Sequence, residues 1–198
     1  MRPVVLASKS ASRAATLRGA GVAFETVASG VDEETVKMRL LYAGEGPREI
    51  AAQLAEAKAL AVSVQRPDAL VLGADQTLDL DGALFDKASD LGEATARLRR
   101  LRGQAHYLHS AVAAAVGGAV IWRTLESPRL VMRDFSDVFL EGYLARGGET
   151  LLGSVGCYLL EAEGAQLFDR IEGDYFAVLG LPLLPLLDLL RREGALAA

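Results

Sequence analysis

Short apolar runs alternate along the chain with longer segments in which apolar residues recur at a helical period. The first kind predicts buried strands, and the second predicts helices packed on a sheet. Strands are expected at 4–7, 24–27, 69–74 and 155–161. In the segment that begins at Pro47 and runs to about Val64, Ile50, Leu54, Ala57 and Ala61 follow the helical period, and Pro47 suits a first helical position. A buried helix is expected at Leu183 to Arg192.

Caps and turns place the remaining elements. Ser12, Asp90 and Ser136 are expected to cap helices at 13–19, 91–101 and 137–146. Asp81-Gly82 predicts a hairpin between Leu78 and Phe85. Two β-rich segments, 105–115 and 120–133, meet at Gly117-Gly118, and 31–34 is expected to be an acidic loop. Strands that alternate with helices but also form hairpins predict an α/β fold with a mixed sheet.

Composition narrows the class of protein. A chain of 198 residues with 51% hydrophobic residues can bury a full core. The net charge of −5 argues against duplex nucleic acid and anionic membranes as partners. The apolar stretch 179–190 is too short to span a bilayer and contains two prolines and an aspartate. No signal peptide is recognised, and the single cysteine, Cys157, rules out an intrachain disulfide, so a cytoplasmic location is expected.

Two places in the sequence could carry chemistry, because ligands bind at the carboxyl ends of strands in α/β sheets. Ser8, Ser10 and Arg13 follow the first strand and could bind phosphate, although these residues alone favour an ordinary capped helix with a solvated arginine. Asp75 directly follows the run Val71 to Ala74, so it could activate a water or bind a metal, or be a turn aspartate. Gly73 and Ala74 are expected to leave room for a ligand.

Other charged residues are weaker candidates on their own. Glu33 and Glu34 could be co-ligands of a metal or belong to a surface loop. Lys58 could be a surface lysine, and Lys87 follows the hairpin. His106 and His109 are three apart in an expected strand and so are not expected to bind one metal. No Walker loop, dinucleotide fingerprint or nucleophile elbow occurs.

These residues lie in motifs that resemble the Maf family of nucleotide pyrophosphatases, in the family's order and over almost the whole chain. Residues 6–13 (Leu-Ala-Ser-Lys-Ser-Ala-Ser-Arg) resemble its Leu-Ala-Ser-x-Ser-Pro-x-Arg, and Val31-Asp32-Glu33 its Val-Asp-Glu. Residues 54–59 resemble its Leu-Ala-x-x-Lys-Ala, and Gly73-Ala74-Asp75-Gln76 its Gly-Ala/Ser-Asp-Thr/Gln. Lys87 matches the lysine of its Gly-Lys-Pro, and residues 171–183 match its closing signature.

The resemblance implies one domain over residues 1–198, with two lobes around a central mixed sheet of the Maf/ITPase-like kind, and a homodimer. It implies hydrolysis of a nucleoside triphosphate to the monophosphate and pyrophosphate with Mg²⁺, Mn²⁺ or Co²⁺. By position, Asp75 activates water, Asp75 and Glu33 hold the metal, and Lys58 and Lys87 bind the triphosphate. Ser8, Ser10 and Arg13 form the phosphate-side loop. This agrees with a chemistry that needs positioning and charge neutralisation.

Gln76 and Glu161 make the substrate more specific. One branch of the family acts on dTTP and UTP and carries Thr and Gln at these positions, whereas the 7-methyl-GTP branch carries Gln and Glu. The chain resembles the second branch, and a carboxylate suits the N–H groups and positive charge of a methylated guanine. Glu161 could also be a surface residue at the end of a strand.

The chain departs from the family pattern around the loop and the second lysine. Ala11-Ser12 replaces Pro and a bulky or basic residue, and Asp86 and Ala88 replace the Gly and Pro around Lys87. An alternative is therefore kept: a nucleotide-binding regulator of cell division with little turnover. The two functions differ in whether bound nucleotide is hydrolysed.

Overall fold

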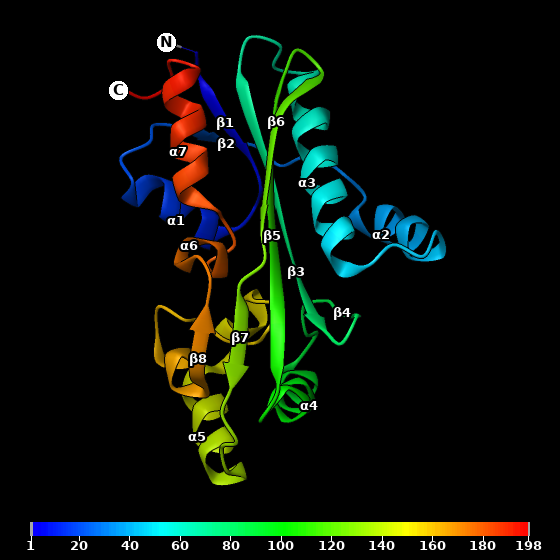
Figure 1. Cartoon of the computed structure of the whole chain (residues 1–198), viewed down its shortest axis with the longest axis vertical. Coiled ribbons are helices and arrows are strands. Elements are labelled where there is room, and N and C mark those ends of the chain that lie inside the picture. The colour runs from blue at the N-terminus through cyan, green and yellow to red at the C-terminus, as the bar shows by residue number, and fades with distance from the viewer. Residues whose placement is uncertain (1, 198) are drawn as a thin grey trace.

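A single mixed β-sheet runs through the molecule, and the computed structural model describes residues 2–197 of the chain. Its strands follow the order β2-β1-β3-β5-β7-β8, while β4 pairs with β3 and β6 with β5 (Figure 1). Their bounds are Val4–Ala7 (β1), Glu25–Thr26 (β2), Leu70–Leu80 (β3), Ala83–Phe85 (β4), Ala105–Val116 (β5), Ala119–Glu126 (β6), Arg129–Met132 (β7) and Phe168–Glu172 (β8). The α/β fold with a mixed sheet is thus confirmed.

The long strands β3 and β5 connect the two ends of the molecule (Figure 1). β1 runs parallel to the first half of β3, with Ala7 opposite Gly73. β5 runs antiparallel to β3 from the pair Val71 and Ala115 to the pair Asp79 and Tyr107. Asp75 therefore lies within β3, two residues after the last residue of β3 that pairs with β1. At Asp75, β1 no longer covers that edge of β3.

Seven α-helices are described within residues 2–197. They are α1 (Ala11–Gly19), α2 (Glu33–Tyr42), α3 (Pro47–Ser63), α4 (Leu91–Leu101), α5 (Asp137–Gly147), α6 (Tyr175–Val178) and α7 (Leu183–Arg192). α3 lies on one side of β3 and β5, and α1 and α7 lie on the other (Figure 1). Two 3-10 helices, Gly148–Gly153 and Glu163–Leu167, follow α5.

Small residues bring α3 unusually close to the sheet. Ala51, Ala55 and Ala59 pack on alanines of β5, with all three helix residues fully buried. A Cβ atom added to Gly73 would lie 2.1 Å from the Ala55 carbonyl oxygen and 2.4 Å from the Ala59 nitrogen. The space beside Gly73 is therefore filled by the backbone of α3, and the expectation that it admits a ligand is wrong.

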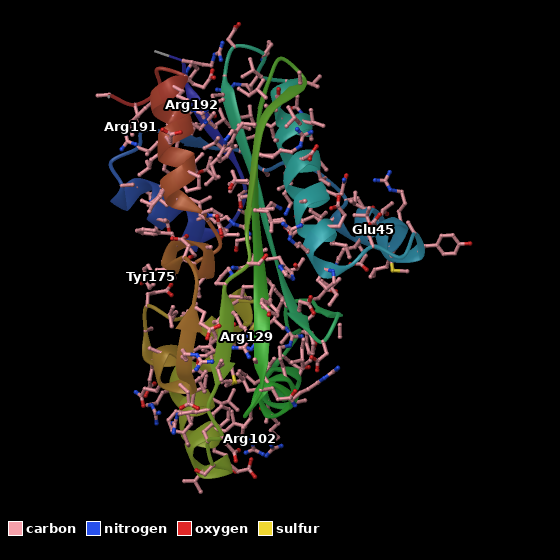
Figure 2. The ribbon with its side chains drawn as sticks, in the orientation of Figure 1. Glu45, Arg102, Arg129, Tyr175, Arg191 and Arg192 are labelled. Atoms are coloured by element: carbon pink, nitrogen blue, oxygen red, sulfur yellow. The ribbon has the colours of Figure 1, made fainter. Side chains whose placement is uncertain are left out.

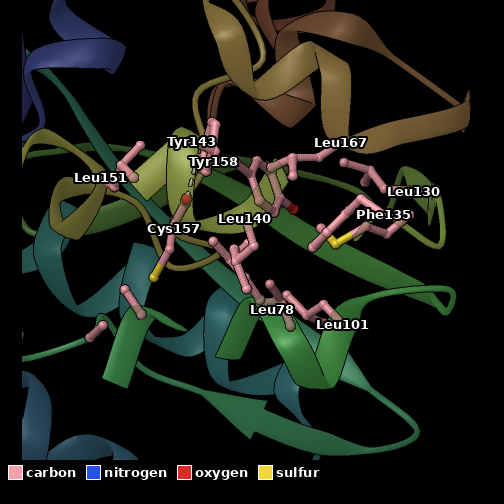
Figure 3. Packing of buried hydrophobic residues seen from close by; sticks show 14 of the residues in the cluster. Leu78, Leu101, Leu130, Phe135, Leu140, Tyr143, Leu151, Cys157, Tyr158 and Leu167 are labelled. Carbon is pink, nitrogen blue, oxygen red and sulfur yellow. Dashed lines mark hydrogen bonds between the residues drawn. The ribbon is translucent and has the colours of Figure 1, made fainter. Parts of the chain in front are cut away.

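A second core fills the other end of the molecule, under α4 and α5 (Figure 3). Leu78, Leu101, Leu140 and Tyr143 meet there, and the Tyr143 hydroxyl donates to the Cys157 carbonyl oxygen at 3.3 Å. Cys157 is fully buried in this cluster. The segment around Cys157 is thus held by packing rather than by strand pairing.

Four local expectations are wrong. α1 begins at Ala11, because the hydroxyl of Ser10, not Ser12, accepts from the Arg13 nitrogen and caps the helix. The expected acidic loop is instead the start of α2, capped by Asp32. The expected strand 155–161 is turns without sheet pairing, and Cys157 has a φ of 58°. Residues 168–172, which were not expected to form a strand, are β8 on β7.

Arginines are spread over the surface rather than gathered on one face. Arg191 and Arg192 extend from the end of α7, while Arg102 lies at the opposite end of the molecule (Figure 2).

None of the helices formed by residues 2–197 has the length and hydropathy that a membrane span requires.

Candidate functional site

A cleft of about 630 Å³ opens beside the carboxyl ends of β1 and the parallel half of β3. It is lined by all nine residues that the sequence singled out: Ser8, Ser10, Arg13, Glu33, Lys58, Asp75, Gln76, Lys87 and Glu161. They come from the loop after β1, from α1, α2, α3 and β3, and from the segments after β4 and before the 3-10 helix 163–167. The structure thus brings together side chains that are up to 153 residues apart, from position 8 to position 161.

Asp75 and Lys58 form a buried ion pair at the floor of the cleft. Nζ of Lys58 lies 2.7 Å from Oδ1 of Asp75 and 2.9 Å from Oε2 of Glu33. Asp75 is 8% exposed and Lys58 is 5% exposed, so Lys58 is not the surface lysine that an alanine-rich helix allows. Oδ2 of Asp75 makes no hydrogen bond with any of residues 2–197 and is not among their fully buried atoms, so water can reach it.

Burial raises the pKa of Asp75 above its ordinary value, while the charges of Lys58 and Arg13 act in the opposite direction. A buried carboxylate with two cations nearby is held as an anion but is more basic than one in water. Such a group is suited to accept a proton from a water molecule.

Arg13 reaches into the cleft from α1 and is held by backbone atoms. Its Nε donates to the Gly180 carbonyl oxygen at 2.9 Å, and Nη1 donates to the Ala74 carbonyl oxygen at 3.0 Å and the Ser8 hydroxyl at 3.2 Å. Burial lowers the pKa of Arg13, and the charges of Asp75 and Glu33 oppose this, so the guanidinium stays charged. Among residues 2–197, Nη2 has no hydrogen-bond partner, which leaves both of its N–H groups for a ligand.

The loop 8–10 is organised around its serine hydroxyls. The Ser10 nitrogen donates to Oγ of Ser8 at 3.2 Å, and the Ser10 hydroxyl caps α1. Ser12, which the sequence placed at the cap, donates to the Leu179 carbonyl oxygen at 3.1 Å. The loop is thus tied to the segment before α7, and the N-terminal end of α1 points a positive helix end towards the cleft.

Gln76 is fixed by contacts on one side only. Its amide nitrogen lies 2.7 Å from Oγ of Ser110 and 3.0 Å and 3.1 Å from the carbonyl oxygens of Ala177 and Val178. Both amide protons are therefore used within the protein. The carbonyl oxygen of Gln76 is the atom that remains for recognition of a ligand.

Lys87 and Glu161 lie at the mouth of the cleft. Both are exposed, and neither makes an ion pair with another of residues 2–197. Glu161 lies in the turn that ends the segment 155–161, so its position depends on the packing of Tyr158 and Cys157 in the core below.

Sequence reasoning missed Lys37, Phe85 and Tyr158, which also line the cleft. Nζ of Lys37 lies 2.6 Å from Oδ1 of Asp86 and 2.8 Å from Oε2 of Glu34. A signal for Lys37 existed: Asp32 and Thr35 form a helix cap, which would have placed Lys37 one turn after Glu33 on a helix.

Several known proteins are similar to this chain over nearly its whole length. The family model described as Maf-like protein matches residues 3–193. The nucleoside triphosphate pyrophosphatase of Caulobacter vibrioides is 59% identical over 99% of this chain and 98% of its own. That of Granulibacter bethesdensis is 51% identical over 98% of both chains. The 7-methyl-GTP pyrophosphatase of Rhizobium meliloti is 46% identical over 100% of both chains.

Proposed function

Because this chain belongs to the Maf-like proteins and is a nucleoside triphosphate pyrophosphatase, we propose that its substrate carries 7-methylguanine or another modified base. We also propose that a water activated by Asp75 breaks the triphosphate. The observation that carries this mechanism is the buried ion pair of Asp75 with Lys58. The ammonium of Lys58 also contacts Glu33.

In this mechanism Asp75 is the general base. Its Oδ2 takes a proton from water as the water oxygen bonds to phosphorus. The bridging oxygen of the α–β anhydride leaves with pyrophosphate, so the products are the monophosphate and pyrophosphate. Lys58, 2.7 Å from Oδ1, keeps Asp75 ionised and orients it.

Cations around the cleft neutralise the charge that develops on the phosphates. Arg13 offers the two N–H groups of Nη2, and Lys87 offers an ammonium that makes no ion pair with another of residues 2–197. Placed donors of this kind supply most of the catalysis in phosphate transfer, because no covalent intermediate is needed.

The donor set fits a divalent ion that arrives with the substrate. Mg²⁺ commonly binds one or two carboxylates together with substrate phosphates, and Asp75 and Glu33 supply two carboxylates around one ammonium. Residues 2–197 hold no group of three or more His, Cys, Asp or Glu side chains that would form a cage without substrate. Asp75 and Glu33 would hold the ion, which would further neutralise the phosphate oxygens.

Gln76 and Glu161 are proposed to select the base. The free carbonyl oxygen of Gln76 and the carboxylate of Glu161 are acceptors, and a guanine edge presents donors. Glu161 also favours a ring that is positively charged by N7 methylation.

The resemblance also supports a cytoplasmic homodimer in which residues 1–198 act as one two-lobed unit. Cleft residues from position 8 to position 161 are consistent with one functional unit. A single cooperative unfolding transition and a dimer mass by light scattering are the expected results.

A pyrophosphate-release screen tests the proposal. Purified protein with Mg²⁺, Mn²⁺ or Co²⁺ should hydrolyse 7-methyl-GTP faster than GTP, dTTP or UTP, and EDTA should abolish the activity. Asp75→Asn should lose at least about 1,000-fold in kcat while its circular dichroism is unchanged. Tight nucleotide binding without turnover under every metal would instead support the regulator.

A further inference from the structure

Arg97, in the middle of α4, lies behind the cleft wall and not within the lining itself. It is 6% exposed, and its guanidinium contacts two separate segments of that wall. Nη1 donates to the carbonyl oxygen of Val155 at 2.6 Å and also to the carbonyl oxygen of Asp86. One side chain thus joins the segment that carries Lys87 to the segment that leads to Glu161.

The segment around Lys87 is held at both ends from the same helix. Arg97 binds the carbonyl oxygen of Asp86, the residue before Lys87. Glu93, one turn earlier on α4, accepts from the Ser89 nitrogen at 2.8 Å through Oε2, while its Oε1 accepts from Nη2 of Arg97 at 2.8 Å. Ala88 between them is buried. Lys87 is therefore an exposed residue in a short segment whose backbone is fixed on either side.

The burial of Arg97 needs an explanation beyond packing. A buried guanidinium costs several kcal/mol of desolvation, and here Nε is buried without a hydrogen-bond partner among residues 2–197. Its carboxylate partner, Glu93, has a side chain that is 45% exposed, so the ion pair returns only part of that cost. An apolar residue would fill the site without this desolvation cost, but it could not bind the carbonyl groups of two separate chain segments.

We propose that Arg97 is a positioning residue: it fixes the position of Lys87 relative to the segment of the cleft wall that runs from Val155 to Glu161. The inference rests on the proposed role of Lys87 in binding the triphosphate. A displacement of Lys87 by about 1 Å is enough to cost a large factor in rate, because catalysis here depends on placed charge.

A double-mutant cycle tests this role. Arg97→Met should lower kcat/KM by about 10- to 100-fold, and Lys87→Ala should lower it at least as much. The double variant should be no slower than Lys87→Ala alone, because Arg97 acts through Lys87. Arg100→Met is the matched control: Arg100 lies on the same helix, over Phe85 at 4.8 Å from the ring centroid, but donates to no carbonyl of the wall. It should leave kcat/KM unchanged.

The outcomes distinguish the positioning role of Arg97 from the role of Lys87 in binding the triphosphate. Multiplied losses in the double variant would overturn the positioning role and leave the function of Lys87 intact. Full activity of Lys87→Ala would overturn the role of Lys87 and this inference with it. If Arg97→Met does not fold, the same cycle is run with Arg97→Lys, which keeps the charge but lacks the planar fork. A smaller loss that again vanishes in the Lys87→Ala background supports the proposal.

Discussion

Nζ of Lys58 lies 2.7 Å from Oδ1 of Asp75, and the same atom contacts Glu33, so one ammonium serves two carboxylates on different elements. The charge of Lys58 lowers the pKa of Asp75, whereas burial raises it. The pair therefore sets the pH at which the proposed base is available.

Lys58→Met should move the acidic limb of the kcat/KM profile to higher pH. Without the ammonium, burial of Asp75 is less opposed, its pKa rises further, and it becomes protonated at a pH where the wild-type enzyme is still active. Pyrophosphate release measured between pH 4 and 9 checks this. Lys37→Met is the control, because Lys37 pairs with Glu34 and Asp86 rather than with Asp75. An unmoved limb in Lys58→Met would show that Asp75 is not the titrating group.

Gly73→Ala should destabilise the fold by about 3 kcal/mol or more, because its Cβ would lie 2.1 Å from the Ala55 carbonyl oxygen. The backbone of α3 must then move, and Lys58 moves with it. Urea denaturation followed by circular dichroism measures the loss. Gly19→Ala is the control: its Cβ would meet nothing within 4 Å, so stability should stay the same or rise slightly. Equal stability of the two variants would contradict the close approach of α3.

Glu161→Gln should lower kcat/KM for 7-methyl-GTP relative to dTTP by about 10-fold, because a charged acceptor for the base is lost. Glu163→Gln is the matched control two residues away. Glu163 pairs with Arg146 at 2.7 Å and does not line the cleft, so the substrate ranking should not change. If the two variants rank the substrates alike, Glu161 does not contact the base.

His106 should make the protein less stable in mild acid. It is fully buried beside Tyr158, and burial lowers its pKa from 6.5 to about 4. Between these values the unfolded chain binds a proton that the folded protein excludes, so the free energy of unfolding falls as pH drops from 6.5 to about 4. The total effect of His106 is at most about 3 kcal/mol.

His106→Phe should flatten this slope. The pKa of His109 is also lowered by burial and contributes in the same direction, so the difference between wild type and variant isolates His106. Urea denaturation at pH 4.5, 5.5 and 7 gives the comparison. Parallel slopes would mean that His106 takes up its proton at the same pH in the folded and the unfolded protein.

Elements with strong local signals were predicted well. The strand at Val4–Ala7, the helix capped by Asp90 and the last helix at Leu183–Arg192 are confirmed to the residue or nearly so. The Asp81-Gly82 hairpin is confirmed as well, with Leu78 opposite Phe85. In each case the cap, turn or apolar run is complete within a few residues, so no distant contact is needed to choose the structure.

The wrong elements have two causes: a local helix signal that was interpreted as a loop, and burial that depends on tertiary contacts. Glu33 and Glu34 indicated a loop by charge, but acidic residues in a first turn stabilise a helix. Residues 155–161 have the apolar content of a strand, yet Cys157 and Tyr158 are buried by side-chain packing without a neighbouring strand. A single sequence cannot distinguish these two ways of burying the same residues.

In the site, too, residues within local motifs were predicted, whereas contacts between distant segments were not. The motifs located nine of the residues that line the cleft, but the sharing of Lys58 between Asp75 and Glu33 depends on α2, which was not expected. The role of Arg97 had no local signal, since the two carbonyl groups that it binds lie 11 and 58 residues away.

Arg13 contacts Gly180, and Gln76 contacts Ala177 and Val178, so the phosphate-side loop and the proposed base-recognition residue are both completed by the end of the chain. A nascent chain on the ribosome that has β1, α3 and β3 but not yet residues 177–180 carries Asp75 and Lys58 without these supports. Synthesis of the last ninth of the protein would therefore complete the cleft, because only then do Arg13 and Gln76 gain the backbone atoms that hold them.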